Sequence, residues 1–315
     1  MNIVYATDDN YVRPLGVSMV SLFENNKDTK EIIVYIIENN VKEESKIKLY
    51  EIAKKYKRSI KFIDFKKICS DLHINVKFPL VAYGRLFLYK LEEVDKILYL
   101  DSDTIVNSSI EELYETNIDE YEVAGVQDNA AYYLLKKIGM AKKDRYINSG
   151  VLLINLKKWR ENDIGNRFLK FIKKNNGKVN HHDQGVINGV CKNSTLILNP
   201  KYNMMPEMIS MTVKQSNILY NVHNYYTQDE INEAVKSPVI IHYIEKFYSR
   251  PWKIDCTHPM KDRFFYYLDK TTFSKSLDER GLNKKIQFRK KIYDKYPFII
   301  YVIFEKILNI RRIFL

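Results

Sequence analysis

The strongest constraint on the fold is a regular alternation of strand-like and helix-like segments in the first third of the chain. Short runs rich in β-branched and aromatic residues alternate with longer runs whose apolar residues recur every three or four positions. The strand-like runs are residues 2–7, 31–37, 59–65 and 96–100, and the helix-like runs are residues 14–25, 41–56 and 82–94. This rhythm predicts an α/β fold with a mostly parallel central sheet and helices on both faces.

The alternation continues as far as residue 260 and then changes. The later segments that predict strands, helices or the loops between them are residues 123–128, 146–159, 181–191 and 237–252. From Asp255 to Lys275 the sequence becomes polar and irregular, which indicates a boundary. We therefore predict one domain over residues 1–260 and a helical C-terminal extension over residues 261–315.

Carboxylates stand at the ends of two predicted strands. Asp8 and Asp9 end the first strand, and Asp101 and Asp103 end the fourth, in the stretch "ILYLDSDTIV". Ligands of parallel sheets lie at the carboxyl ends of the strands, so these acids predict one shared site. Neighbouring carboxylates repel each other and are costly to desolvate, and a divalent cation between them is the usual solution.

The basic character of the chain is concentrated in its C-terminal extension. Ten basic and two acidic residues between Arg280 and Leu315 carry +8 of the net charge of +12, so a general nucleic-acid-binding function is disfavoured. The apolar run from Phe298 to Phe304 is far shorter than the roughly 20 residues that span a bilayer. Basic flanks and interleaved aromatic residues suit a helix in the interface of an anionic membrane, over residues 284–315. A helix packed on its own domain or on a partner subunit is the alternative.

The N-terminus and the cysteines indicate a cytoplasmic location, on the inner face of the cell membrane if the extension binds lipid. The stretch "MNIVYATDDN" enters a strand directly, without the basic and apolar regions of a secretory signal. Three cysteines (Cys69, Cys191 and Cys256) are too few and too widely spaced for a disulfide framework, and they fit a reducing compartment.

Two metal-dependent chemistries use an aspartate pair after a buried strand. One is a phosphatase of the haloacid dehalogenase type, in which the pair supplies a nucleophile and an acid–base group. That motif usually begins its domain, whereas here much α/β sequence precedes it, and no downstream glycine–aspartate pair completes a magnesium site. The other is a nucleotide-sugar transferase, in which the cation bridges the diphosphate of the donor.

Six ordered blocks favour the transferase. They are "IVYATDDNYVRPLGVSMVSL", "YGRLFL", "KILYLDSDTIV", "INSGVLLINLKKW", "HHDQGVIN" and "IHY…RPW". In these blocks, over roughly residues 1–260, the chain resembles glycosyltransferase family 8, the group of glycogenin and the bacterial lipopolysaccharide galactosyl- and glucosyltransferases. The resemblance implies a GT-A fold with a Rossmann-like nucleotide-sugar-binding domain, Mn²⁺ or Mg²⁺, a UDP-glucose or UDP-galactose donor, and retention of the anomeric configuration.

The resemblance also implies roles for individual residues. Asp101 and Asp103 match the DxD motif and His242 the third metal ligand, a mixed set that Mn²⁺ accepts. For His242 the alternative is a strand-end histidine bonded to a backbone carbonyl. Donor-binding positions in the first, third and fourth blocks are Ala6, Thr7, Asp8, Asn10, Tyr11, Ser102 and Asn148. The stretch "TDDN" could equally be a strand-to-helix turn with Asp and Asn caps.

Further implied positions surround the diphosphate and the transferred sugar. Arg85 matches an arginine near the diphosphate, although it could be a surface arginine on a helix. Asp128, Asn148, Asp183 and Gln184 match positions that bond sugar hydroxyls, and Asp183 could instead cap a helix.

The stretch "HYIEKFYSRPW" departs from the family pattern. Relatives usually carry a phosphate-binding lysine shortly before "PW", where this chain has Arg250. Ile244 and Glu245 replace a glycine, and the loop is about two residues longer than usual. Either Lys246 or Arg250 could therefore bind the diphosphate, and Trp252 could be a lid residue or a packing residue.

Retention requires a double displacement or a front-side attack. The position beneath the anomeric carbon matches Gln184, an amide and a poor nucleophile, while Asp183 and Asp128 are assigned to sugar hydroxyls. We therefore expect a front-side attack in which a leaving phosphate oxygen takes the acceptor's proton and Gln184 stabilises the oxocarbenium-like state.

The expected function is the metal-dependent, retaining transfer of a hexose to a saccharide or glycolipid acceptor in cell-surface polysaccharide or lipopolysaccharide synthesis. The alternatives are the phosphatase and a catalytically silent, membrane-bound sugar-binding protein, for which the altered loop at Lys246–Arg250 is the support.

Overall fold

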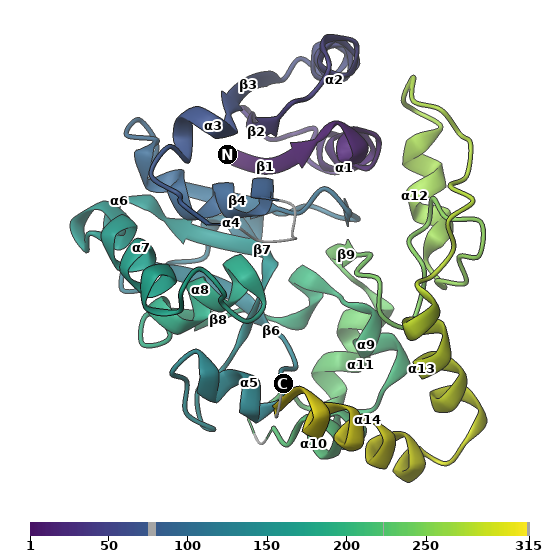
Figure 1. Cartoon of the computed structure of the whole chain (residues 1–315). Helices are drawn as coiled ribbons and strands as arrows, with labels where there is room; N and C mark the ends of the chain where they lie inside the picture. Colours follow the sequence, from purple (N-terminus) through teal and green to yellow (C-terminus); the bar gives the residue numbers. More distant parts are fainter. Residues whose placement is uncertain (75–79, 223, 314–315) are drawn as a thin grey trace.

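The computed structural model of the chain describes residues 1–74, 80–222 and 224–313, with side chains in the last helix as far as Leu308 (Figure 1). Its centre is a seven-stranded sheet of order β3-β2-β1-β4-β7-β6-β8. The strands are β1 (Asn2–Asp8), β2 (Ile33–Asn39), β3 (Ser59–Asp64), β4 (Lys96–Leu100), β6 (Val123–Gln127), β7 (Ile147–Asn155) and β8 (Thr195–Ile197). Strand β7 runs antiparallel to β4 and β6, and the other neighbouring pairs are parallel. The predicted α/β class with a mostly parallel sheet is confirmed.

Helices cover both faces of the sheet, as the alternation predicts. The helices that pack on one face are α1 (Val12–Glu24) and α2 (Glu43–Lys55), and those on the other face are α3 (Phe65–Ile68), α6 (Leu156–Glu161), α7 (Ile164–Lys174) and α8 (His182–Cys191). Ile3 and Tyr5 of β1 belong to the core on the face of α1, while Val4 belongs to the core on the opposite face. The strand is apolar on both sides because both sides are buried.

The predicted helix over residues 82–94 is a run of 3-10 turns, η2 (Leu80–Lys90), and ends earlier than predicted. Most of its side chains are buried, so this segment lies inside the protein and is not an amphipathic surface helix. Gly84 allows η2 to pack closely against β2, since a Cβ atom there would lie 2.9 Å from a methyl carbon of Ile37.

A second, two-stranded sheet lies beside the first. β5 (Thr104–Val106) follows the Asp101–Asp103 turn and pairs antiparallel with β9 (Ile240–His242), so that Thr104 lies opposite His242. The remaining short elements are η1 (Asp9–Tyr11), α4 (Glu111–Glu115), α5 (Tyr132–Lys137), η3 (Pro200–Asn203), α9 (Pro206–Ser210), α10 (Val213–Tyr220) and α11 (Gln228–Lys236).

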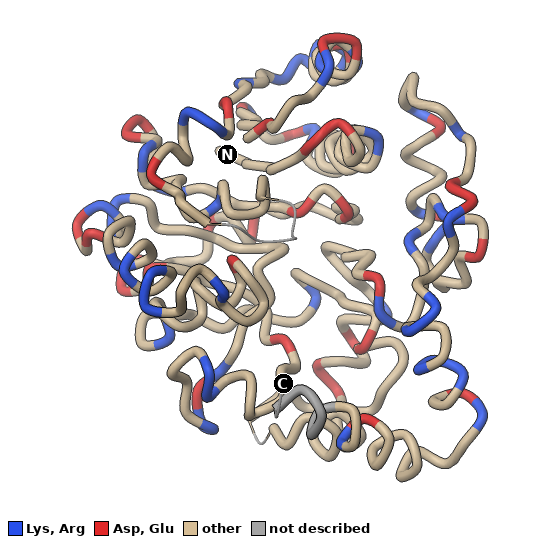
Figure 2. The backbone as a smooth tube through the Cα atoms, in the orientation of Figure 1, with Lys and Arg blue, Asp and Glu red and all other residues tan. Residues whose placement is uncertain are grey.

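The C-terminal extension begins on the main domain. Helix α12 (Lys261–Leu268) packs against α1, and its Phe264 and Tyr267 belong to the same core. The division at residue 260 stays a prediction. Helices α13 (Lys284–Lys295) and α14 (Phe298–Ile313) lie at the opposite end of the molecule from α2 (Figure 1), and Lys and Arg residues mark α13 in Figure 2. Among the described residues, no helix is long and apolar enough to cross a bilayer.

Candidate active site

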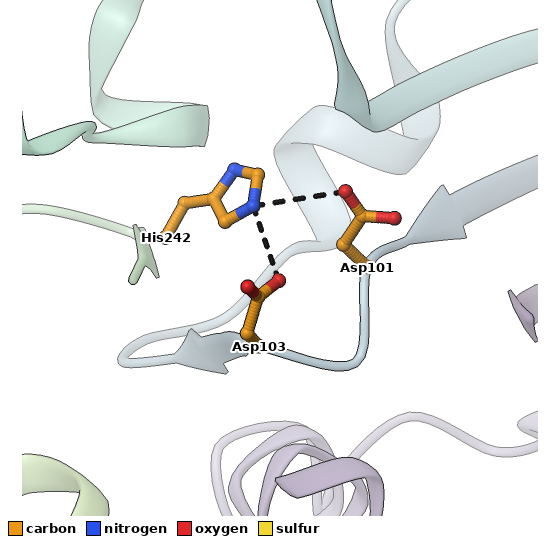
Figure 3. Close-up of side chains that lie close together, drawn as sticks. All are labelled: Asp101, Asp103 and His242. Carbon is orange, nitrogen blue, oxygen red and sulfur yellow. Dashed lines mark ion pairs between the residues drawn. The ribbon is translucent and has the colours of Figure 1, made fainter. Parts of the chain in front are cut away.

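Two aspartates and a histidine converge at the carboxyl end of β4 (Figure 3). The ligand atoms of Asp101, Asp103 and His242 all lie within 4.8 Å of one another. The Nε2 atom of His242 is 3.2 Å from Asp103 Oδ1 and 3.7 Å from Asp101 Oδ2. Two carboxylates that face one imidazole nitrogen require positive charge between them, and this donor set fits a divalent cation.

The two-stranded sheet brings these residues together from distant parts of the chain. The Tyr243 amide donates to the Asp103 carbonyl over 2.9 Å, which extends the β5–β9 pairing to the end of the turn. On the other side of the turn, the Asp101 amide donates to the Gly150 carbonyl over 2.7 Å. Backbone bonds on both sides therefore hold the aspartates in position before any cation binds.

Gly150 provides the space for this cluster. A Cβ atom at this position would lie 2.2 Å from His242 Cε1 and 2.7 Å from Asp101 Oδ2. Such contacts are far inside van der Waals separation, so only glycine lets the imidazole and the carboxylate close over β7. The glycine of the "INSG" stretch thus makes room for the Asp101–Asp103–His242 cluster.

Arg250 is a second source of positive charge at the cluster. Its Nε is 3.0 Å from Asp103 Oδ2, and its guanidinium lies over the ring of Tyr11, 5.5 Å from the ring centroid. Burial favours the neutral form of Asp103, but Arg250 and the contact with His242 outweigh burial and hold the pKa of this carboxyl below its ordinary value. Trp252 is buried, packs against Phe264 of α12 and lies beneath Arg250, so it is a packing residue.

A pocket of about 200 Å³ opens beside the cluster, between the ends of β1 and β4. The residues that line it and were predicted from the sequence are Ala6, Thr7, Asp8, Tyr11, Arg85, Asp101, Ser102, Asp103 and Arg250. The Ser102 hydroxyl donates to the Ala6 carbonyl over 3.2 Å, which ties the two strand ends together. Asn10 does not line the pocket and its side chain is exposed. Asp8 accepts from the Asn10 amide, so the turn also has the caps of the alternative interpretation.

Arg85 joins this pocket to a buried group of polar side chains. It is only 3% exposed, and it pairs with Asp101 at 2.9 Å and with Asp183 at 3.2 Å. Its guanidinium also lies over Tyr99, 4.0 Å from the ring centroid. Burial lowers the pKa of Arg85, but the two aspartates reverse this and raise it. The surface-arginine alternative is therefore wrong.

Replacing Arg85 with lysine is expected to weaken both the fold and the site. A lysine ammonium has no planar fork, so it cannot pair with Asp101 and Asp183 while stacking on Tyr99. We expect a loss of about 3 kcal/mol in the free energy of unfolding, comparable to breaking a buried ion pair. Urea denaturation measures it, with Arg13→Lys as the control because Arg13 donates its hydrogen bonds to exposed backbone carbonyls, those of Ser274 and Ser276. Equal stability of R85K and the wild type would contradict this account.

Asp128, Asn148, Asp183 and Gln184 form one hydrogen-bonded group. Asp128 Oδ2 accepts from Asn148 Nδ2 at 3.1 Å and from Gln184 Nε2 at 3.0 Å. Gln184 Oε1 in turn accepts from the Ser149 amide at 3.1 Å. Burial raises the pKa of Asp183 despite the nearby Arg85. The four residues from three predicted segments thus meet next to Arg85.

Lys246 lies elsewhere. Its ammonium pairs with Glu207 and stands over Tyr220, and it lines a different pocket of about 280 Å³ together with His181. Arg289, Tyr301 and Glu305 of the C-terminal helices also line that pocket. Of the two cations left open by the sequence, Arg250 is the one beside the aspartate pair.

Sequence reasoning missed two residues of the site. Ser149 Oγ donates to Asp183 Oδ2 over 3.2 Å, and "INSG" displayed this serine between two residues that were singled out. Asn203 bonds to both His242 and Asn148 at 2.9 Å, but no pattern in the sequence around it marks it. The imidazole of His242 is thus bonded to a side-chain amide and not to the backbone carbonyl of the alternative interpretation.

Known proteins of one family are similar to this chain. A model described as glycosyl transferase family 8 matches residues 2–256. General stress protein A of Bacillus subtilis (strain 168) is 28% identical over 284 residues, which cover 87% of this chain and 95% of that protein. Lipopolysaccharide 1,2-glucosyltransferase of Escherichia coli is 28% identical over 275 residues, which cover 84% of this chain and 76% of that protein. The crystal structure of galactosyltransferase LgtC in complex with donor and acceptor sugar analogs superposes with a TM-score of 0.73 at 28% identity, covering 87% of this chain and 97% of LgtC.

Proposed function

The chain belongs to glycosyltransferase family 8 and has a GT-A-type fold, and we propose that it moves glucose or galactose from a UDP-sugar to a saccharide or glycolipid acceptor, with retention, in cell-surface polysaccharide or lipopolysaccharide synthesis. The observation that carries the proposal is the Asp101–Asp103–His242 cluster beside a pocket at the ends of β1 and β4. Family membership over most of the chain removes the phosphatase alternative.

The pocket has the chemistry of a nucleoside-diphosphate site. Asp8 and Tyr11 line the pocket at the end of β1, where Asp8 would accept from the uracil N–H and Tyr11 would contact the base. We assign Asp101, Asp103 and His242 as the ligands of Mn²⁺ or Mg²⁺, which would neutralise charge that develops on the leaving diphosphate. Arg250 would add a second positive charge on the same oxygens, in the place of the usual lysine.

The hydrogen-bonded group of Asp128, Asn148, Asp183 and Gln184 would bind the transferred sugar. The Gln184 side chain donates from its amide nitrogen to Asp128 and accepts from the Ser149 backbone amide at its carbonyl oxygen, so its orientation is fixed. A carboxamide is nevertheless a poor nucleophile. Asp183 is buried, paired with Arg85 and bonded to Ser149, which leaves it poorly disposed to attack carbon. These contacts support front-side attack, in which the acceptor hydroxyl gives its proton to the departing phosphate oxygen and Gln184 stabilises the cationic sugar through its carbonyl dipole.

The pocket lined by His181 and Lys246 would receive the acceptor. Asn129, which follows Asp128 in the chain, lines this pocket, and His181 and Lys246 both interact electrostatically with Asp128. This pocket therefore lies close to the group that would bind the sugar. Tyrosine rings of α10 and α14 contribute apolar surface of the kind on which sugar faces stack.

UDP release from a panel of UDP-sugars with Mn²⁺ tests this function. We expect slow release from UDP-glucose or UDP-galactose without an acceptor, and its loss when a chelator removes the metal. A mass spectrum without a sugar adduct on Asp183 would fit front-side attack, and a trapped adduct would overturn that part. Mn²⁺-dependent UDP binding without turnover of any sugar would favour the catalytically silent sugar-binding protein.

We further propose that α13 and α14 place the enzyme on the cytoplasmic face of an anionic membrane. Ile299, Ile303 and Ile307 recur at the helical interval of four and are each more than half exposed, so they form one apolar face of α14. Exposed Phe288 of α13 joins them through contact with Phe304. The excess of basic residues around this face complements acidic lipid headgroups. Residues 309–315 of the predicted segment carry no described side chains.

Replacing Ile299, Ile303 and Ile307 together with serine is expected to lower vesicle binding at least tenfold. Burial of three isoleucine side chains in the lipid interface provides the free energy that serine lacks. Co-sedimentation with vesicles of phosphatidylcholine and about 30% phosphatidylglycerol measures binding, which should weaken with salt. Ile254→Ser is the control, since Ile254 is 62% exposed outside the C-terminal helices. Unchanged vesicle binding of the triple variant would contradict the membrane proposal. A wild-type dimer that the triple variant disrupts would instead identify a second copy of the chain as the partner of this face.

A further inference from the structure

We propose that Asn203 is a positioning residue that fixes the tautomer and orientation of His242 and thereby sets the affinity of the site for its divalent cation. The inference rests on the proposed metal site and extends it to a residue outside the ligand set. Asn203 is fully buried at the end of η3, with its side chain between His242 and the sugar-binding group.

Hydrogen bonds on the side of Asn203 that faces Asn148 fix the orientation of the Asn203 side-chain amide. Asp128 Oδ2 accepts from Asn148 Nδ2 at 3.1 Å, so Asn148 Oδ1 points away from Asp128. That oxygen already accepts from the Gly150 amide at 2.9 Å, which is a donor that cannot reverse. Asn148 Oδ1 therefore presents an acceptor to Asn203, and Asn203 must turn its NH₂ group toward it, at 2.9 Å.

The orientation of Asn203 also determines which nitrogen of the His242 imidazole carries a proton. With its nitrogen committed to Asn148, Asn203 presents its oxygen to His242 Nδ1, at 2.9 Å. Because a carbonyl oxygen only accepts, Nδ1 must carry the proton. Neutral His242 then has its lone pair on Nε2, the atom that faces Asp101 and Asp103. The histidine is thus held in the tautomer that binds a metal, as outer hydrogen bonds to metal-bound histidines do.

The backbone makes this arrangement rigid. The Met204 amide donates to the Ile240 carbonyl at 2.9 Å, and the His242 amide donates to the Met204 carbonyl at 3.0 Å. These bonds hold the residue after Asn203 alongside β9, so the amide and the imidazole cannot drift apart. One chain of oriented hydrogen bonds therefore links Asp128 to the metal ligand His242.

Mn²⁺ affinity, measured by calorimetry without nucleotide, tests the proposal. We expect Asn203→Leu to bind Mn²⁺ 10- to 100-fold more weakly than the wild type, the usual loss when an outer partner of a metal ligand is removed. Asn203→Asp should lose less affinity than Asn203→Leu, because a carboxylate still accepts from Nδ1–H, although its second oxygen faces Asn148 Oδ1 with no proton to donate. Asn188→Leu is the matched control: Asn188 is a buried amide that bonds to the Ile147 backbone, and its loss should affect folding without affecting Mn²⁺.

The tautomer itself can be read without a variant. In the metal-free wild type with ¹⁵N-labelled histidine, we expect a proton on His242 Nδ1, whether or not Nε2 also carries one toward the two carboxylates. A His242 protonated on Nε2 alone would overturn the proposal, as would a folded N203L variant with the Mn²⁺ affinity of the wild type. Failure of the wild type itself to bind Mn²⁺ would instead contradict the metal site and the proposed function.

Discussion

Replacing Asp103 with asparagine is expected to lower metal-dependent UDP release about a thousandfold. The substitution keeps the size of the side chain but removes a charge from a site that must hold a cation. Loss of the cation removes several kcal/mol of stabilisation from the departing diphosphate, and each 1.36 kcal/mol is tenfold in rate. The substitution also removes the ion pair between Asp103 and Arg250. Initial rates of UDP formation at saturating donor measure the effect.

Asp9→Asn is the matched control for that experiment. Asp9 stands at the same end of the sheet, next to Asp8, but its carboxylate accepts from the Ser45 hydroxyl at 2.7 Å and from the Lys42 amide at 3.1 Å. It faces α2 and does not line the pocket. We expect its rate to stay within a few-fold of the wild type. A D103N variant with the same rate as D9N would show that the cluster does not serve the reaction.

The second large effect is expected from Gly150→Ala. The added methyl group would occupy the space of His242 Cε1 and crowd Asp101 Oδ2, so the imidazole must move away from both carboxylates. We expect Mn²⁺ affinity to fall at least a hundredfold and the free energy of unfolding to fall by about 2 kcal/mol, as overpacking of a core usually costs. Calorimetry with Mn²⁺ and urea denaturation measure the two quantities separately.

Gly125→Ala provides the comparison. Gly125 lies in the neighbouring strand β6, and a Cβ atom there would lie 2.8 Å from the end of the Ile147 side chain. Both variants therefore crowd the core of the sheet, but only one crowds metal ligands. We expect both to lose stability and only G150A to lose Mn²⁺ affinity. Equal Mn²⁺ affinity of the two would mean that the glycine is not required by the cluster.

The strands and the aspartate pair could be predicted because their signals are local. Each strand of the first half is a short apolar run between polar turns, and buried parallel strands produce that pattern wherever they occur. The position of the acids followed from the same logic, since the carboxyl ends of β1 and β4 must lie on one edge. Asp8 and Asp101 do line one pocket there.

The rest of the site depends on contacts that no local pattern contains. The pairing of β5 with β9 joins residues 104–106 to residues 240–242 and brings His242 beside Asp103. The sequence indicated His242 as a ligand only through the family resemblance, since no local pattern links it to the aspartates. Asn203 could not be found because its role is defined entirely by its two partners. The choice between Lys246 and Arg250 was open for the same reason: the loop carries both cations, and Glu207, distant in sequence, pairs with Lys246.

Diffraction from crystals grown with Mn²⁺ and UDP, recorded at the manganese absorption edge, tests the central claim most directly. We expect an anomalous peak bounded by Asp101, Asp103 and His242, with the UDP diphosphate between that peak and Arg250. UDP bound in the pocket with no metal peak at these three residues, or a peak at another place in the molecule, would contradict the account.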